Sequence, residues 1–261
     1  MLKFTSLGLG GGAGRGPSTN DAVGCNADYA ESASLTGVSD GKSGVFSCWF
    51  KILGNDANLQ YLFSQAVGAG APYGLFIYRD KNDDLMKIAG YNAAGASILS
   101  CDSVTTFDSA TNTGWHHLLI SWDLAVAGSF RMYIDDVDES PTETTYTDDT
   151  LDYTKTRNRV LDDAGFAGAY APWNGEVFDF WLSFNSYLDF DVAANRREFI
   201  DATGKPVDLG SDGTLPGITP AIYMALDDGD ATYDNWATNR GTAGTFTLTG
   251  ALAVATDSPN D

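Results

Sequence analysis

The sequence is short of positive charge and of long apolar runs. Its 261 residues include 15 Lys and Arg against 35 Asp and Glu, a formal net charge of −20. A chain with so few basic residues lacks the positive footprint of a nucleic-acid-binding protein and of a protein that docks on anionic lipid. No apolar stretch is long enough to span a bilayer, and the first residues do not read as a signal peptide.

Histidine and cysteine are also scarce. Cys25, Cys48 and Cys101 are odd in number and widely spaced, so neither a zinc motif nor a disulfide framework is indicated, although one disulfide stays open. His116 and His117 are adjacent in a predicted strand, so they point to opposite faces. They therefore cannot hold one metal ion together, and a Ser-His-Asp or Cys-His catalytic site has little support.

What the chain does contain is typical of an all-β protein. Gly occurs 29 times, and aromatic residues make up 12% of the chain. One short helix is predicted at 191–200, and the Thr- and Asp-rich residues 138–158 are predicted to form a surface loop. Period-two alternation between turn signals predicts strands at 45–53, 61–64, 73–78, 85–88, 97–99, 115–123, 130–135, 166–169, 176–184, 221–226 and 245–249.

The segments 115–123 and 130–135 form the central predicted hairpin. Apolar side chains alternate onto both faces of 115–123, which predicts a strand lying between two layers. Asp135 and Asp136 supply the turn that follows. About a dozen short strands with regular turns predict a β-sandwich or jelly roll.

No linker between two large domains is evident. Residues 1–27 are predicted to be a Gly-rich N-terminal arm, 28–250 a jelly-roll domain with a C-terminal extension from about 203, and 251–261 a tail. The arm contains a Gly-x-Gly-x-x-Ala match to the dinucleotide fingerprint. We reject this match because no strand precedes it and Pro17 prevents the helix that should follow.

Carboxylates offer two candidate sites, and the spacing speaks against both. Glu176 and Asp179 are three residues apart, whereas glycosidases on this type of fold use acids at i, i+2 and i+4, where Phe178 and Phe180 stand. Asp80-x-Asn82-x-Asp84 resembles half of a Ca²⁺ loop. Leu85 replaces the required Gly and Tyr91 the bidentate Glu, which favours a polar turn.

The loop around residues 170–174 is the candidate carbohydrate-binding site. Tyr170 and Trp173 could stack on a sugar ring, and Asn174 could hydrogen-bond its hydroxyls. The alternative is that Trp173 covers one end of the core, since Trp is highly buried on average. The alternative is favoured by roughly two to one.

Several motifs, in order along residues 27–185, resemble the concanavalin A-like lectin/glucanase superfamily, near its laminin-G and pentraxin branch. The motifs are 46–51 (FSCWFK), 114–117 (GWHH), 132–136 (MYIDD) and 175–180 (GEVFDF). Residues 204–213 and 239–250 are similar to lectin-like structural proteins of tailed bacteriophages. The resemblance implies an all-β, concanavalin A-like jelly-roll sandwich and a virion component, and it carries over no catalytic, sugar or Ca²⁺ ligands.

On these grounds we expect a non-enzymatic bacteriophage virion protein, either a capsid decoration (cement) protein or a head fibre. The alternatives are a tail-fibre adhesin that binds host-surface carbohydrate and, third, a glycan hydrolase. We expect contacts with other virion proteins through the arm 1–27, a homo-oligomer such as a trimer, and a location in the virion, assembled in the host cytoplasm. Neither nucleic acid nor membrane insertion is expected. No cofactor is predicted; Ca²⁺ remains open without a ligand set.

Overall fold

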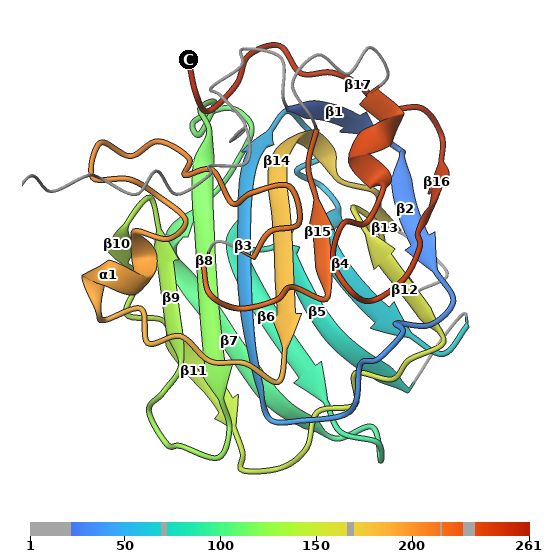
Figure 1. The fold of residues 1–261 in the computed structure, drawn as a ribbon, viewed down its shortest axis with the longest axis vertical. Helices are drawn as coiled ribbons and strands as arrows, with labels where there is room; N and C mark the ends of the chain where they lie inside the picture. The colour runs from blue at the N-terminus through green and yellow to red at the C-terminus, as the bar shows by residue number, and fades with distance from the viewer. Residues whose placement is uncertain (1–21, 69–71, 166–169, 215, 227–232) are drawn as a thin grey trace, which may run out of the picture.

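A computed structural model describes residues 22–68, 72–165, 170–214, 216–226 and 233–261. Within them two sheets pack face to face (Figure 1). Sheet A runs in the order β10 (Val137–Asp138), β9 (Arg131–Ile134), β8 (His116–Asp123), β3 (Ser43–Ile52), β14 (Asn174–Phe184), β1 (Val23–Asn26) and β17 (Ala253–Val254), with β15 (Ile222–Met224) also paired to β14. Sheet B runs in the order β11 (Thr142–Tyr146), β7 (Ser97–Thr106), β6 (Leu85–Tyr91), β5 (Tyr73–Arg79), β4 (Leu59–Ala66), β12 (Arg157–Val160), β2 (Tyr29–Ser32) and β16 (Thr247–Thr249), with β13 (Tyr170–Ala171) paired to β4.

This architecture is the predicted jelly-roll β-sandwich. The strand pairs of the described residues are antiparallel, except that β13 runs parallel to β4. The single α-helix of the described residues, α1 (Ala193–Arg196), has four residues, and a 3₁₀-helix, η1, covers Tyr233–Ala237. No helix in this part of the chain has the length and apolar character needed to cross a membrane.

Sheet A is buried on both faces, as the alternation of the central strand predicted. Leu118 and Ile120 on β8 pack in the main core between the sheets. Leu119, from the opposite face of β8, belongs to a second apolar cluster together with Trp49 and Trp181. A strand covered on both faces needs apolar residues at nearly every position, and β3, β8 and β14 have them.

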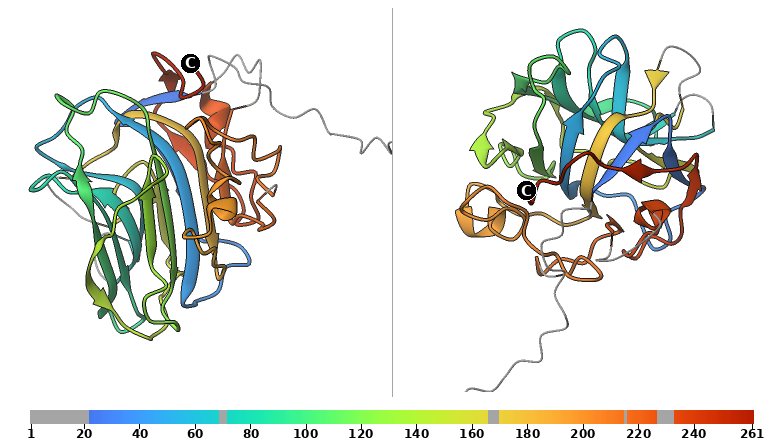
Figure 2. Two further views of the ribbon diagram at one scale, coloured as in Figure 1. Left: turned by 90° about the vertical axis from the view of Figure 1, so that its left-hand side faces the viewer. Right: turned by 90° about the horizontal axis from the view of Figure 1, so that it is seen from above.

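The C-terminal third of the chain covers the outer face of sheet A. Phe190, Phe199 and Leu209 are buried in the second cluster, and Figure 2 shows these orange segments on the side of β3 and β14 that faces away from sheet B. The cover includes the α-helix, none of whose residues is buried. Its Arg196 and the following Arg197 both bind the carboxylate of Asp136.

The hairpin turn between β9 and β10 therefore has two functions. Asp135 and Asp136 have φ values of 53° and 65°, which is the backbone of a two-residue type I′ turn. The Asp135 carboxylate accepts the backbone N–H of His117 at 2.7 Å and contacts the His116 ring at 2.7 Å. The turn thus closes the hairpin and anchors the C-terminal cover.

Both ends of the predicted domain extend further than expected. β1, which lies within the range predicted as the N-terminal arm, pairs with β14, and β17, within the predicted tail, pairs with β1. Lys51 fixes the tail: its Nζ lies 3.1 Å from Glu176, 2.8 Å from Asp257 and 3.2 Å from the Thr256 hydroxyl. Residues 1–21 of the arm lie outside the described residues.

Three local predictions need correction. The stretch 138–158, predicted as a loop, contains β11, an edge strand whose Thr-rich sequence is polar because one side meets water. A bulge at Asp179, with φ of 46°, shifts the register of β14 between Phe178 and Trp181. Phe178 and Phe180, predicted to share one face, therefore lie in different apolar clusters. The helix predicted at 191–200 is shorter, as given above.

His117 is a buried polar group in the second apolar layer. Its ring stacks on Trp49 with centroids 4.5 Å apart, and its Nε2 lies 2.9 Å from the Ser47 hydroxyl. Burial lowers the pKa of His117 from 6.5 to about 3, with the charges of Asp135 and Asp136 opposing the shift. The folded protein therefore holds this ring neutral.

The first prediction concerns acid stability. In the unfolded chain His117 binds a proton near pH 6.5, whereas in the folded protein it does so only near pH 3. The contribution of the neutral ring to the free energy of unfolding should therefore be complete above pH 6.5 and decrease as the pH falls towards 3. Between pH 7 and pH 4 the wild type should lose about 3 kcal/mol more than His117→Gln, measured by urea unfolding. His116→Gln is the control. Equal losses in the wild type and in His117→Gln would contradict the prediction.

Candidate functional site

Of the predicted carbohydrate-binding residues Tyr170, Trp173 and Asn174, the structure places Trp173 in the interior. Trp173 is fully buried and packs edge-to-face on Phe50, with ring centroids 5.7 Å apart. Its ring offers no face to a sugar, so its burial supports the alternative that it covers one end of the core. Asn174 uses its backbone N–H to bind Gln60 and its carbonyl to accept from Leu53. Tyr170 lies in β13 beside β4, and its side chain is outside the described residues.

A different set of aromatic residues gathers on the outer face of sheet B. On β5, Leu75 and Ile77 point into the main core, whereas Phe76 and Tyr78 point outward. Neighbouring strands add further side chains to the same face. We call this cluster the aromatic face; it consists of Leu59, Tyr61, Tyr73, Phe76, Tyr78, Ala89 and Tyr91.

Strand register brings these residues together. Tyr61 on β4 is opposite Tyr78 on β5, with ring centroids 5.4 Å apart. Tyr73 lies next to Tyr91 at 5.7 Å, and Tyr91 lies 6.0 Å from Phe76. Tyr61 and Phe76 are each 3% exposed, whereas Tyr73, Tyr78 and Tyr91 keep part of their surface in solvent. The result is a platform with a buried base and partly exposed tyrosine rings.

Sequence analysis missed this face because its members lie on three strands. The predicted strands 61–64, 73–78 and 85–88 contained most of them, but only the register places Tyr61 beside Tyr78. The available signal was the alternation itself, since outward positions of an exposed sheet face are ordinarily polar. Here they carry tyrosine and phenylalanine instead.

Charged residues border the aromatic face at the β5–β6 turn. Lys87, opposite Tyr78 on β6, lies between three carboxylates, at 3.2 Å from Asp80, 2.7 Å from Asp83 and 3.3 Å from Asp102. Burial lowers the pKa of Lys87, but the bonds to Asp83 and Asp80 and the charge of Asp102 outweigh it and raise the pKa overall. This cation is therefore fully charged and fully paired.

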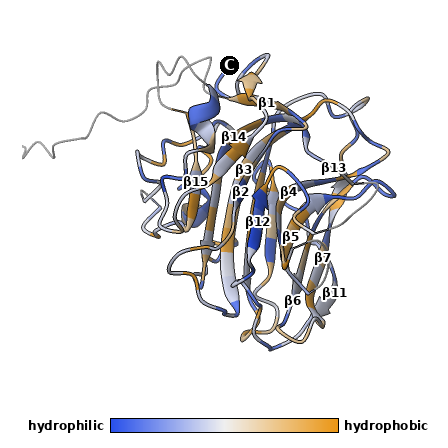
Figure 3. Cartoon of the chain, turned by 90° about the vertical axis from the view of Figure 1, so that its right-hand side faces the viewer, coloured by the Kyte–Doolittle hydropathy of each residue, from blue (hydrophilic) through white to orange (hydrophobic). Residues whose placement is uncertain are grey.

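The opposite border of the face is β12, coloured as hydrophilic in Figure 3. Arg157 and Arg159 both bind the same Glu31 oxygen, at 3.1 Å and 2.6 Å. Arg159 also reaches Asp162 at 2.5 Å and lies over the Tyr29 ring, 4.0 Å from its centroid. Bonds to the two arginines lower the pKa of Glu31 despite the opposing effect of burial, so this border is an ionised, mutually neutralised network.

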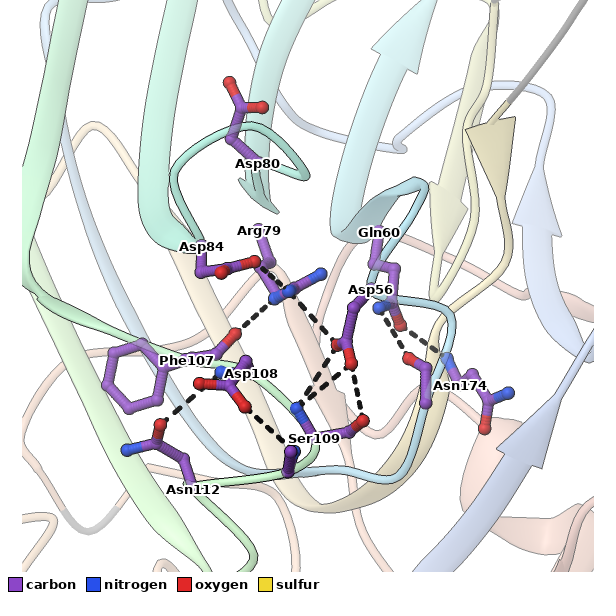
Figure 4. Close-up of polar contacts among 12 residues, drawn as sticks. Asp56, Gln60, Arg79, Asp80, Asp84, Phe107, Asp108, Ser109, Asn112 and Asn174 are labelled. Atoms are coloured by element: carbon purple, nitrogen blue, oxygen red, sulfur yellow. Dashed lines mark hydrogen bonds and ion pairs between the residues drawn. The ribbon is translucent and has the colours of Figure 1, made fainter.

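At the end of β5 the chain forms a second polar cluster at the rim of the sandwich, drawn in Figure 4. Its centre is Arg79, whose side chain is fully buried. The guanidinium binds the Asp84 carboxylate and the Phe107 carbonyl, and it lies 3.1 Å from Asp56. Asp56 in turn accepts from the Ser109 hydroxyl at 2.5 Å. Arg79 thereby joins three loops.

The half Ca²⁺ loop belongs to this region and forms a polar turn. Asp80 points away from Arg79 in Figure 4 and accepts from the Asn82 backbone at 3.0 Å while pairing with Lys87. Asp84 is taken by Arg79. Burial raises the pKa of Asp84, and Arg79 opposes that shift. Across the described residues no group of three or more His, Cys, Asp or Glu side chains is placed to hold a metal ion.

Glu176, the acid considered for hydrolysis, lies far from the aromatic face in the architecture. It sits on β14 of sheet A, is 1% exposed, and is held by Lys51 and by the backbone N–H of Thr256 at 2.5 Å. A general acid must reach the substrate. Glu176 instead fastens the C-terminal tail.

The sequence matches no protein-family model and no curated protein. Among solved structures the chain is similar to a "putative carbohydrate binding protein" from Bacteroides ovatus, with 12% identity, a TM-score of 0.57, and coverage of 91% of this chain and 60% of that one. It is also similar to a SAP-like pentraxin from Limulus polyphemus (12% identity, 67% of this chain, 80% of that chain, TM-score 0.47). A third similar structure is mouse laminin α1 domains LG4-5 (13% identity, 66% of this chain, 42% of that chain, TM-score 0.45).

At such identities the likeness concerns the fold alone. The Bacteroides protein, of which this chain spans 60% of the length, has the same lectin-like sandwich over nearly the whole of the present chain. Together with the two-sheet topology, this similarity supports the predicted concanavalin A-like jelly roll.

The second prediction tests the rim cluster. Arg79→Met should lower the free energy of unfolding by about 3 kcal/mol, because it leaves Asp56 and Asp84 without their buried partner. Chemical denaturation measures the change. Lys42→Met is the matched control, since the Lys42–Asp148 pair is largely exposed and should contribute nothing measurable. If the two variants unfold alike, Arg79 does not hold the loops together.

Proposed function

We propose that the protein is a lectin-like module that binds carbohydrate on the outer face of sheet B. The observation that supports this proposal is the aromatic face itself. Aromatic rings stack on the apolar faces of sugar rings, and tyrosine adds a hydroxyl that can hydrogen-bond beside the stack. Tyr78 and Tyr91 supply both features from rigid neighbouring strands.

The competing structural explanation is that the aromatic face is a small satellite core. Tyr61 and Phe76 fit that explanation, because both are almost fully buried. Tyr78 and Tyr91 do not, since each keeps part of its ring in solvent at the margin of the cluster. A buried aromatic base that carries partly exposed tyrosines is a pre-organised platform, which lowers the entropic cost of binding.

Binding is favoured over hydrolysis by the state of the nearby acids. Asp80 and Asp102 are the carboxylates closest in register to Tyr78, and both pair with Lys87. A glycosidase needs two carboxyl groups that face the scissile bond with separated pKa values. Among the described residues of this face, the acids serve instead to hold Lys87.

We further propose that the module belongs to the virion of a tailed bacteriophage. The support is the resemblance of residues 204–213 and 239–250 to lectin-like phage structural proteins, together with the Gly-rich segment 1–27, a composition suited to an arm that is ordered by a neighbouring subunit. Sequence alone favoured capsid decoration. The aromatic face favours the tail-fibre adhesin, because a cement protein needs no sugar platform. A homo-oligomer remains our prediction.

The third prediction concerns binding. Tyr78→Ala and Tyr91→Ala should each weaken glycan binding about tenfold or more, as expected when a stacking contact of about 1.5 kcal/mol is lost. A glycan array followed by calorimetry on the strongest hit measures the effect. Tyr187→Ala is the matched control, because Tyr187 is a half-buried tyrosine that bonds Ser129 away from this face. Unchanged affinity in both face variants would refute the site.

The fourth prediction concerns location. Immunogold labelling or cryo-electron microscopy of purified virions should place the protein at the tail tip, where an adhesin meets the host surface. Particles labelled on the capsid shell would restore the decoration hypothesis. Absence from the particle would remove the virion proposal while leaving carbohydrate binding to be judged on its own measurements.

A further inference from the structure

We propose that the aromatic face selects neutral glycans and discriminates against acidic ones. This inference rests on the proposed function, since it specifies the ligand of the same face. It follows from the arrangement of the charged residues around Tyr78 and Tyr91.

The first step is the excess of carboxylates at the β5–β6 border. The turn and the strand positions beside it carry Asp80, Asp83 and Asp102 against Lys81 and Lys87. Lys87 is surrounded by all three acids. An anionic sugar placed on Tyr78 would therefore meet three carboxylates, whose charge the two lysines do not fully cancel.

The same charges act on the phenol of Tyr78. Burial is the main cause that raises the pKa of Tyr78; the charges of Asp80 and Asp102 raise it further, and Lys87 opposes them. The carboxylates beside this ring therefore act in the same direction on any negative charge brought close to it.

The second step is that the arginines of the opposite border are already neutralised. An acidic sugar is ordinarily recognised by a bidentate arginine. Arg157 and Arg159 share Glu31, and Arg159 also holds Asp162. To capture a ligand carboxylate, Arg159 would have to give up charge-assisted bonds that it already makes. Arg157, which bonds Glu31 through Nε alone, would still have to share its charge with Glu31, so the affinity gained would be reduced.

The third step is the charge of the whole chain. With a net charge of −20, approaching polyanions are repelled before contact, and this repulsion weakens as salt screens it. Neutral glycans are repelled neither by the carboxylates beside Tyr78 nor by the net charge of the protein. Stacking on the tyrosines then remains as the main source of affinity.

The test compares neutral glycans with their carboxylated and sulfated forms on one array, followed by calorimetry of the best-binding backbone in both forms. Neutral forms should bind at least about fivefold more tightly at low salt, which is the effect of a few unit charges near 8 Å in water, and the ratio should shrink as salt is added. Acidic forms that bind as well as or better than their neutral partners would overturn the inference while leaving carbohydrate binding intact.

A charge variant makes the test specific to the face. Asp83→Asn/Asp102→Asn should raise the affinity for the acidic form about fivefold relative to the neutral one. The control Glu198→Gln/Asp212→Asn removes the same total charge at exposed positions that belong to neither border, so it should change the ratio much less. An equal shift in both variants would mean that only global charge acts, against the inference. Failure of every glycan to bind would instead refute the proposed function.

Discussion

The structure depends on one constraint: sheet A is apolar on both faces. Strands β3, β8 and β14 contribute to the core between the sheets and also to a second layer on their outer side. A single sandwich cannot cover that outer side, so the C-terminal third has to lie over it and stay there. The turn at Asp136 and the bridge at Lys51 fasten this cover at two points. The binding face that we propose lies on sheet B, whose outer face receives no such cover from the described segments.

A second constraint follows from the shortage of positive charge. Fifteen basic residues serve a chain with 35 acids, and three of the buried or nearly buried ones each bind several acceptors. Arg79 ties the rim loops, Lys51 ties the tail, and Lys87 ties the β5–β6 turn. Desolvating a cation is costly unless its partners are well placed, and these partners are. These three cations are thus held by the fold, and Lys87, the one of them that lies beside Tyr78, is already paired with carboxylates.

Much of the fold could be predicted from the sequence because alternation is a local property. The hairpin of β8 and β9, the separation of His116 from His117, and the burial of Cys48 all follow from a period of two. Prediction failed where a single backbone residue changes the period, as at the Asp179 bulge, and where an edge strand is polar, as in β11. Neither feature has a hydrophobic signature.

The position of Trp173 and the composition of the aromatic face have a related explanation. In the sequence, Trp173 beside Asn174 resembles a sugar-binding loop. Burial of a large indole, however, contributes most to the stability of the fold, and Trp173 lies in the core. The partly exposed tyrosines come from β5 and β6, above a base that includes the buried Tyr61 of β4, and these residues become neighbours only through inter-strand register. A platform on a sheet is also stiffer than one on a loop, since each ring is held by the pairing of its own strand. A stacking site for an uncharged glycan requires this rigidity. Each stacking contact contributes little binding free energy, which cannot offset the entropy lost when a mobile loop becomes ordered.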